Sequence, residues 1–156
     1  MENQLAPISN VWLAAMIDGE GTITLQRTGK RRVSTGEMGL QPIIIISNTN
    51  QAIIEASRIF MEELGVNPYI KSQSFGRNGR GWKTEYKLQV GGLTKTPIVL
   101  KAIRPYLFGK LAQADLVLEF CQSRIDKGKP KGFAYDEREL EILRAIRGLN
   151  ARGVRD

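Results

Sequence analysis

The residues best placed to do chemistry are two acids, Asp18 and Glu20, in the segment Met16-Ile17-Asp18-Gly19-Glu20-Gly21. An apolar stretch precedes them, so both carboxylates fall at the C-terminal end of a predicted helix. The negative end of the helix dipole disfavours each carboxylate there by roughly 0.3–1 kcal/mol. A divalent cation is the strongest compensating partner, because it also binds the backbone carbonyls of that helix end. The alternative is that both acids are solvated turn residues.

The sequence contains no histidine. This excludes Ser-His-Asp and Cys-His hydrolases, His-ligated zinc sites and His general bases. Hydrolytic chemistry would therefore depend on carboxylates, lysine and a metal with oxygen ligands. The single cysteine, Cys121, cannot form an intramolecular disulfide, and its helical setting predicts a small core residue rather than a nucleophile.

The two acids stand where a helix is expected to meet a strand. The helix is predicted from Ser9 to Asp18, with Ser9 or Asn10 as the N-cap and Gly19 just beyond the end. A strand is predicted from Gly21 to Thr28, because polar and apolar residues alternate along it.

The remaining elements follow from hydrophobic spacing and turn residues. In chain order they are a basic turn at 29–36, a strand ending in 43–46, a helix over about 50–64, hairpin arms at 69–75 and 84–90, a helix opening at Thr96-Pro97, a helix over about 110–125, and a last helix with a capping box at Asp136 and Glu139. The four isoleucines at 43–46 are too uniformly apolar for their faces to be assigned. In the second arm, one face holds Tyr86, Leu88 and Val90 and the other holds Glu85, Lys87 and Gln89.

This order indicates an α+β fold with one antiparallel sheet. The 156 residues fit a single domain, 1–156, with a core over about 9–125 and a loop and C-terminal helix in 126–156. No apolar run approaches the roughly 18 residues of a membrane span, and the first residues lack the pattern of a secretory signal. We therefore expect an intracellular protein with no membrane partner.

The net charge is +7, and it is unevenly distributed. Residues 22–48 carry four basic residues and Glu37, a net charge of +3, and residues 69–104 carry eight basic residues and Glu85, a net charge of +7. The rest of the chain therefore sums to −3, so the excess lies on predicted strands and their loops. Surface charge can simply keep a protein soluble. Solubility alone would not concentrate the charge on a sheet, and the pattern favours an anionic partner.

One face of such a sheet packs on the core, and the other can lie against DNA. Lysine and arginine neutralise phosphates, whereas threonine, glutamine and glutamate can hydrogen-bond to base edges in the major groove. The aromatic residues alternate poorly for a stacking platform, which favours duplex over single-stranded DNA. The candidate DNA-binding residues are Thr24, Gln26, Thr28, Lys30, Arg31, Arg32, Lys71, Gln73, Phe75, Arg77, Arg80, Lys83, Glu85 and Lys87.

The segment Leu13-Ala14-Ala15-Met16-Ile17-Asp18-Gly19-Glu20-Gly21 resembles the LAGLIDADG motif of homing endonucleases. A later segment, Pro105-Tyr106-Leu107 with Lys110, Gln113-Ala114 and Leu116, also resembles that family, so the likeness covers about residues 9–120. It implies the αββαββα fold, in which helices back a four-stranded, saddle-shaped antiparallel sheet that sits in the major groove. The chain departs from the family pattern at Glu20, which is more often Asp, and at Ala15, which is more often Gly.

The resemblance also implies roles for individual residues. Glu20 would bind the metal with help from the Gly19 carbonyl, and Asp18 would position the motif end. Lys110 would lie near the scissile phosphate or its water network. A polar residue at the end of the second strand orders water in related single-motif enzymes, and here either Ser47 or Asn48 falls at that place.

With one motif, the chain resembles the homodimeric, intron-encoded type, and two identical sites would cut the two strands. The expected dimer interface is Trp12, Leu13, Ala14, Met16 and Ile17. The implied function is cleavage of a long pseudo-palindromic duplex site with Mg²⁺, in a site that Mn²⁺ or Ca²⁺ could also occupy. The first alternative is a protein of the same fold that binds nucleic acid without cleavage, such as an RNA maturase or a regulator. The second is a basic structural domain, for example a ribosome-associated protein.

Overall fold

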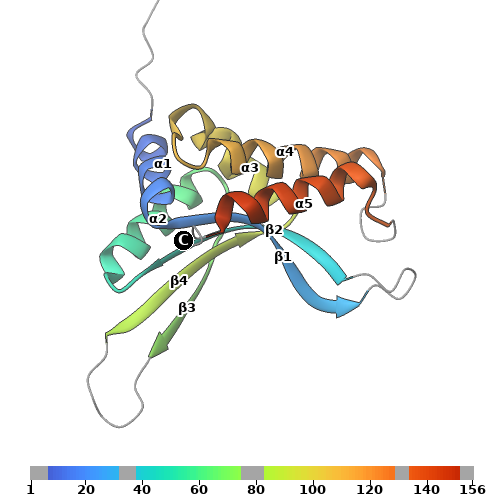
Figure 1. The fold of residues 1–156 in the computed structure, drawn as a ribbon. Helices are drawn as coiled ribbons and strands as arrows, with labels where there is room; N and C mark the ends of the chain where they lie inside the picture. The colour runs from blue at the N-terminus through green and yellow to red at the C-terminus, as the bar shows by residue number, and fades with distance from the viewer. Residues whose placement is uncertain (1–6, 32–37, 75–82, 129–133, 152–156) are drawn as a thin grey trace, which may run out of the picture.

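A computed structural model describes residues 7–31, 38–74, 83–128 and 134–151. Four antiparallel strands in the order β1-β2-β4-β3 form one sheet, and helices cover one of its faces (Figure 1). The predicted α+β fold and the order of its elements are confirmed. The elements are α1 (Ile8–Glu20), β1 (Gly21–Arg31), β2 (Met38–Asn48), α2 (Gln51–Glu63), β3 (Tyr69–Ser74), β4 (Thr84–Gly91), α3 (Lys95–Ile103), a 3₁₀ turn (Arg104–Tyr106), α4 (Leu111–Asp126) and α5 (Glu137–Asn150).

The sheet is arched rather than flat. In Figure 1 the β1–β2 and β3–β4 hairpins diverge below the helices, and no helix covers the underside of the sheet. We call this uncovered side the open face. By strand alternation and register its residues are Thr22, Thr24, Gln26 and Thr28 on β1, Gln41, Ile43, Ile45 and Ser47 on β2, Tyr69, Lys71 and Gln73 on β3, and Glu85, Lys87, Gln89 and Gly91 on β4.

The pairing register assigns faces to the isoleucine run of β2. Ile44 lies opposite Ile23 and Val90, and Ile46 lies opposite Leu88. All five of these side chains are buried in the core. Ile43 and Ile45 therefore point to the open face. The alternation that we predicted for β4 is confirmed, with Leu88 and Val90 on the core side.

The boundaries of α1 differ from our prediction. The helix begins at Ile8 after Pro7, without a side-chain cap, so Ser9 and Asn10 are not the N-cap. It also continues through Gly19 to Glu20, and Gly21 is both the C-cap and the first strand residue. The prediction was wrong because a glycine usually marks a helix end, whereas here the chain passes from helix to strand without a loop.

Two other boundaries were also misplaced, while one cap was correct. Strand β1 continues past Thr28 to Arg31, through an irregular register. Helix α3 begins at Lys95, so Thr96 lies inside it rather than capping it. The buried Thr96 hydroxyl is within 3.2 Å of the Pro42 carbonyl, to which it donates. The predicted capping box of α5 is confirmed, since Asp136 and Glu139 each accept a hydrogen bond from the other's backbone N–H.

The first half of β2 extends beyond β4 and would otherwise have an open edge. Pairing between the two strands starts only at Ile43 and Gly91. On that edge the Leu40 N–H donates to the Tyr135 hydroxyl at 2.7 Å. Pro42 has no N–H to leave unpaired, and its carbonyl accepts from the Gly92 N–H at 3.0 Å. This edge is therefore occupied by groups from α3 and from the loops that precede α3 and α5.

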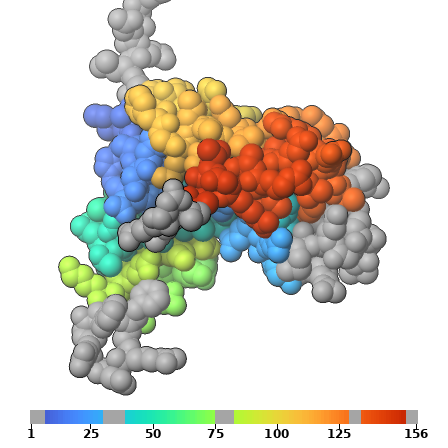
Figure 2. Space-filling model, viewed as in Figure 1, coloured from blue at the N-terminus to red at the C-terminus, as the bar shows by residue number. Residues whose placement is uncertain are grey.

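Helix α5 belongs to the same core as the rest of the chain. Figure 2 shows it packed along α4. Ile142, Leu143 and Ile146 are buried, so the core extends beyond the expected range of 9–125. Arg124 of α4 and Glu139 of α5 form a buried ion pair with an N–O distance of 3.2 Å. Among the helices of the described residues, none has both the length and the apolar character of a membrane span.

Cys121 is a residue of α4 and is buried in the core. Burial raises the pKa of its thiol to about 12, so the thiol stays protonated near neutral pH. The expectation of a small core residue rather than a nucleophile agrees with this environment.

The passage from α1 to β1 depends on a missing side chain at Gly21. A Cβ atom there would lie 2.7 Å from the Ile17 Cα and 2.9 Å from its carbonyl oxygen, which are backbone atoms that cannot rotate away. We therefore expect Gly21→Ala to lower the free energy of unfolding by about 1–3 kcal/mol in urea titrations.

Gly148→Ala is the matched control, because Gly148 lies in α5 with no atom within 4 Å of the added Cβ. Higher helix propensity should leave this variant as stable as the parent or up to about 1 kcal/mol more stable. Equal unfolding midpoints for the two variants would contradict the proposed clash.

Candidate functional site

The end of α1 is tied to a distant loop through Asp18. Its two carboxylate oxygens accept hydrogen bonds from the Phe108 N–H at 2.8 Å and the Lys110 N–H at 2.9 Å. The Lys110 ammonium returns to the same residue and donates to the Asp18 carbonyl at 2.6 Å. These three bonds fix the loop before α4 against the motif helix. They agree with the positioning role that we expected of Asp18.

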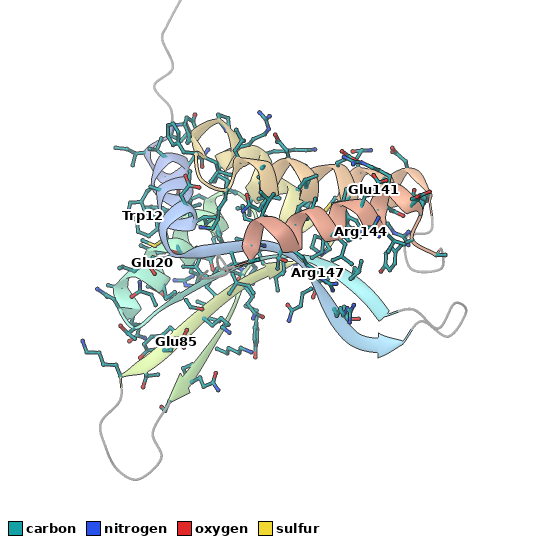
Figure 3. The ribbon with its side chains drawn as sticks, in the orientation of Figure 1. Trp12, Glu20, Glu85, Glu141, Arg144 and Arg147 are labelled. Atoms are coloured by element: carbon teal, nitrogen blue, oxygen red, sulfur yellow. The ribbon has the colours of Figure 1, made fainter. Side chains whose placement is uncertain are left out.

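Lys110 is therefore brought to the helix end that carries Glu20. A cation at the C-terminal end of a helix is favoured by the dipole, and Lys110 occupies that place for α1. Glu20 is the last helical residue, is exposed, and lies where α1 meets the sheet (Figure 3). Within the residues that the structure describes, no hydrogen bond or ion pair engages the Glu20 carboxylate.

The donor set at this helix end fits a hard divalent cation. The Glu20 carboxylate and the Gly19 carbonyl are oxygen ligands of the kind that Mg²⁺ and Ca²⁺ prefer. Magnesium commonly takes only one or two protein carboxylates and keeps several waters. In the described part of the chain, no group of three or more acidic, cysteine or histidine side chains forms a complete metal site.

The register distinguishes Ser47 from Asn48. Ser47 is on the open face, directly opposite Lys87. Asn48 is on the other face, and its side-chain oxygen accepts from the Asn50 N–H at 2.8 Å in the turn that leads into α2. Ser47 is therefore the hydroxyl available to the open face, while Asn48 is used in the turn.

Half of the fourteen candidate DNA-binding residues lie on the open face. Lys83 immediately precedes β4 and is exposed. The residues that reach the open face are Thr24, Gln26, Thr28, Lys71, Gln73, Glu85 and Lys87, of which Glu85 is labelled in Figure 3. Those outside the described residues are Arg32, Phe75, Arg77 and Arg80, together with the side chains of Lys30 and Arg31. Sequence reasoning missed Gln41, Ile43 and Ile45, because the isoleucine run concealed the alternation of β2. It also missed Tyr69 on β3.

The open face carries two positive charges at directly opposite positions. Lys71 and Lys87 are directly opposite each other on β3 and β4. Like charges at opposite positions in antiparallel strands are destabilising, and a bound anion would remove that cost. The sequence interpretation assigned too much charge to the sheet, however. Lys95, Lys101 and Arg104 lie in α3 and the following turn, and Arg104 pairs with Asp115.

The expected dimer interface is wrong for three of its five residues. Leu13, Ala14 and Ile17 are fully buried inside the protomer, so their side chains cannot contact a second copy. Trp12 is partly buried and packs edge-on against Phe60, with ring centroids 5.2 Å apart. Met16 is partly buried against the core. These apolar residues form the stripe that attaches α1 to its own domain.

The outward side of α1 is formed by other residues at helical spacing. Ile8 is 82% exposed and Val11 is 40% exposed, and Ala15 and Gly19 continue the same row at intervals of three or four. Phe108, 91% exposed, is held at the C-terminal end of α1 because its N–H is bonded to Asp18. We call these five residues the outward α1 surface. It combines large exposed apolar groups with two small residues.

We compared this chain with protein-family models, curated sequences and solved structures. No family model matches it, and no curated protein matches its sequence. Solved structures do. The homing endonuclease I-CvuI, in complex with its target in the presence of Ca, aligns with a TM-score of 0.65 over 96% of this chain and 86% of that one, at 18% identity. The homing endonuclease I-TnaI aligns with a TM-score of 0.65 over 92% and 89%, at 16% identity.

A third structure is the LAGLIDADG homing endonuclease I-SmaMI bound to cleaved DNA. It aligns with a TM-score of 0.63 at 16% identity, over 94% of this chain but only 45% of the I-SmaMI chain. The chain therefore has the LAGLIDADG homing-endonuclease fold. The fold implied by the segment 13–21 is thus shown in three dimensions.

The anchoring role of Asp18 can be tested with Asp18→Asn. An amide has one acceptor oxygen, so either the Phe108 or the Lys110 N–H would lose its partner. We expect the free energy of unfolding to fall by about 1–3 kcal/mol and amide hydrogen exchange at both positions to accelerate.

Asp115→Asn is the control, because Asp115 makes an exposed ion pair with Arg104. Such surface pairs contribute about 0–1 kcal/mol. If the two variants lose the same stability, or if exchange at Lys110 is unchanged in Asp18→Asn, Asp18 does not anchor the loop.

Proposed function

We propose that this protein is a site-specific DNA endonuclease of the LAGLIDADG type. It acts as a homodimer and cuts both strands of a pseudo-palindromic duplex. Cleavage uses a divalent cation, for which Mg²⁺ is the first choice. The observation that carries the proposal is the position of Glu20. Its exposed carboxylate ends the motif helix, beside an anchored lysine and at the head of a polar, uncovered sheet face.

In this mechanism Glu20 and the Gly19 carbonyl would hold the cation at the helix end. The bound cation would reduce the charge of the scissile phosphate and lower the pKa of a water molecule. Lys110 adds positive charge next to the phosphate and stabilises the charge that develops as the bond breaks. Ser47 is available to hydrogen-bond a water on the open face. Asp18 keeps these groups in register through its bonds to the loop at 108–110.

The open face supplies the DNA-binding surface. Its arch and its row of threonines and glutamines suit the major groove, where such side chains hydrogen-bond to base edges. The opposed pair Lys71 and Lys87 suits phosphates. Similar structures support this assignment, because I-CvuI is described in complex with its target and I-SmaMI bound to cleaved DNA. The I-CvuI structures in the presence of Ca and of Mg support the choice of cation.

A second copy of the chain completes the site. Each protomer has one motif and one metal-suited carboxylate, and two strands require two sites. The I-SmaMI chain is about twice as long as the part that this chain matches, which is consistent with a pair of such units. We propose that the outward α1 surface forms the contact, with Ala15 and Gly19 allowing the two helices to approach closely about a two-fold axis.

Glu20→Gln tests the catalytic assignment. The amide is the same size but lacks the charge that binds the cation. We expect cleavage of a plasmid carrying the selected site to fall by about 100-fold or more, while duplex binding survives. Chelation of divalent ions should stop the parent enzyme, and added Mg²⁺ should restore it.

Glu63→Gln removes an exposed acid at the end of α2 that has no part in the proposed mechanism, and should cut normally. Undiminished cutting by Glu20→Gln would remove Glu20 from the mechanism. Specific binding by the parent without any cleavage would instead indicate a DNA-binding protein of this fold.

Ala15→Glu tests the dimer contact. Ala15 is exposed in the protomer, so the glutamate should leave the fold intact but place like charges together at the two-fold axis. We expect the variant to be monomeric by analytical ultracentrifugation at micromolar concentration and to lose double-strand cleavage.

The control, Ala145→Glu, makes the same change at an exposed position of α5 and should leave the dimer intact. A parent protein that is monomeric with DNA bound, or an Ala15→Glu variant that still dimerises, would exclude this contact.

A further inference from the structure

A row of four opposed residues crosses the open face at its centre. Thr22 on β1 lies opposite Ile45 on β2, Ile45 lies opposite Gln89 on β4, and Gln89 lies opposite Tyr69 on β3. Ile45 is the exception in this row, because it is aliphatic on a surface that is otherwise mostly polar. It is partly exposed and does not belong to the hydrophobic core.

Ile45 differs from its neighbour Ile43 in what covers it. Ile43 is 4% exposed and lines a small hollow together with Gln41, Tyr69 and Gln89. Gly91, opposite Ile43, has no side chain, and the Gln41 amide lies against it, 2.6 Å from where a Cβ would be. Ile43 is therefore covered by the protein itself, whereas Ile45 presents an aliphatic surface to whatever binds the open face.

Duplex DNA offers few apolar groups to such a surface. In the major groove the C5 methyl of thymine is the apolar feature of a base-pair edge, and aliphatic side chains contact it. Glutamine can form a bidentate pair with N6 and N7 of adenine. Side chains directly opposite on antiparallel strands have Cβ atoms only about 4.5–5.5 Å apart. Ile45 and Gln89 can therefore reach the two halves of one base pair, or two adjacent bases.

Resting on the proposed function, we infer that Ile45 and Gln89 together specify an A·T pair in each half-site of the DNA target, with Ile45 against the thymine methyl and Gln89 hydrogen-bonded to the adenine. The two residues thus act as one reading unit, in which the apolar contact and the hydrogen bonds discriminate by different chemistry. Thr22 and Tyr69 flank the unit on the outer strands.

The base pair read by this unit can be located through Gln89. Sites are selected from a random duplex library, first with the parent and then with Gln89→Arg. Arginine pairs with O6 and N7 of guanine, so the variant should replace one A·T pair per half-site with a G·C pair and leave the other positions as they were. Gln26→Arg, a change on β1, should switch a different pair.

The thymine contact is then tested at the located pair by replacing thymine with uracil, which removes only the methyl group. Loss of one buried methyl should weaken parent binding about fourfold per half-site, measured by fluorescence anisotropy in Ca²⁺. Ile45→Ala should bind the thymine and uracil duplexes equally. Uracil at pairs away from the unit should have no such Ile45-dependent effect.

The outcomes separate this inference from the function on which it rests. If no specific duplex is selected at all, the proposed function fails. In a second case, sites are selected and cut, but the pair that Gln89→Arg switches is not A·T in the parent site, or the duplex with uracil at that pair binds as tightly as the duplex with thymine. Either result would show that Ile45 and Gln89 do not read an A·T pair, and the endonuclease assignment would stand.

Discussion

Helix α1 enters strand β1 without a loop, and the proposed site depends on that junction. Gly21 allows the backbone to lie against Ile17, so the last helical residue and the first strand residue are adjacent in sequence. Glu20 is thereby held between two rigid elements rather than on a flexible turn. Sites built on helices and strands hold their geometry better than sites on loops.

Asp18 gives the same junction its second constraint. A carboxylate at the negative end of a helix is electrostatically unfavourable, and the structure offsets this with two backbone N–H donors and the Lys110 ammonium. The compensating partner that we expected for the two acids is thus internal for Asp18. Among the described residues Glu20 has no such partner. That difference is the reason for proposing Asp18 as a positioning residue and Glu20 as a metal ligand.

Much of this architecture could be predicted from the sequence, and the failures have identifiable physical causes. Alternation along β1 and β4, the capping box of α5 and the family motif gave the fold and the open face. The helix-to-strand junction was missed because Gly19 has the appearance of a C-cap. The interface was misassigned because an amphipathic pattern shows that Leu13 and Ile17 are on the apolar face, but not which partner covers them. Similarly, four consecutive isoleucines carry no period, so only strand register could place Ile45.

The part of β2 that extends beyond β4 shows how a free strand border can be closed without another strand. An arched sheet with a long free strand border invites another chain to add on as a further strand. Here Tyr135 occupies the donor of Leu40, Pro42 has none, and the Pro42 acceptor is already taken by Gly92 and Thr96. That part of the β2 border is therefore closed to a further strand, and the outer strands of the sheet are β1 and β3.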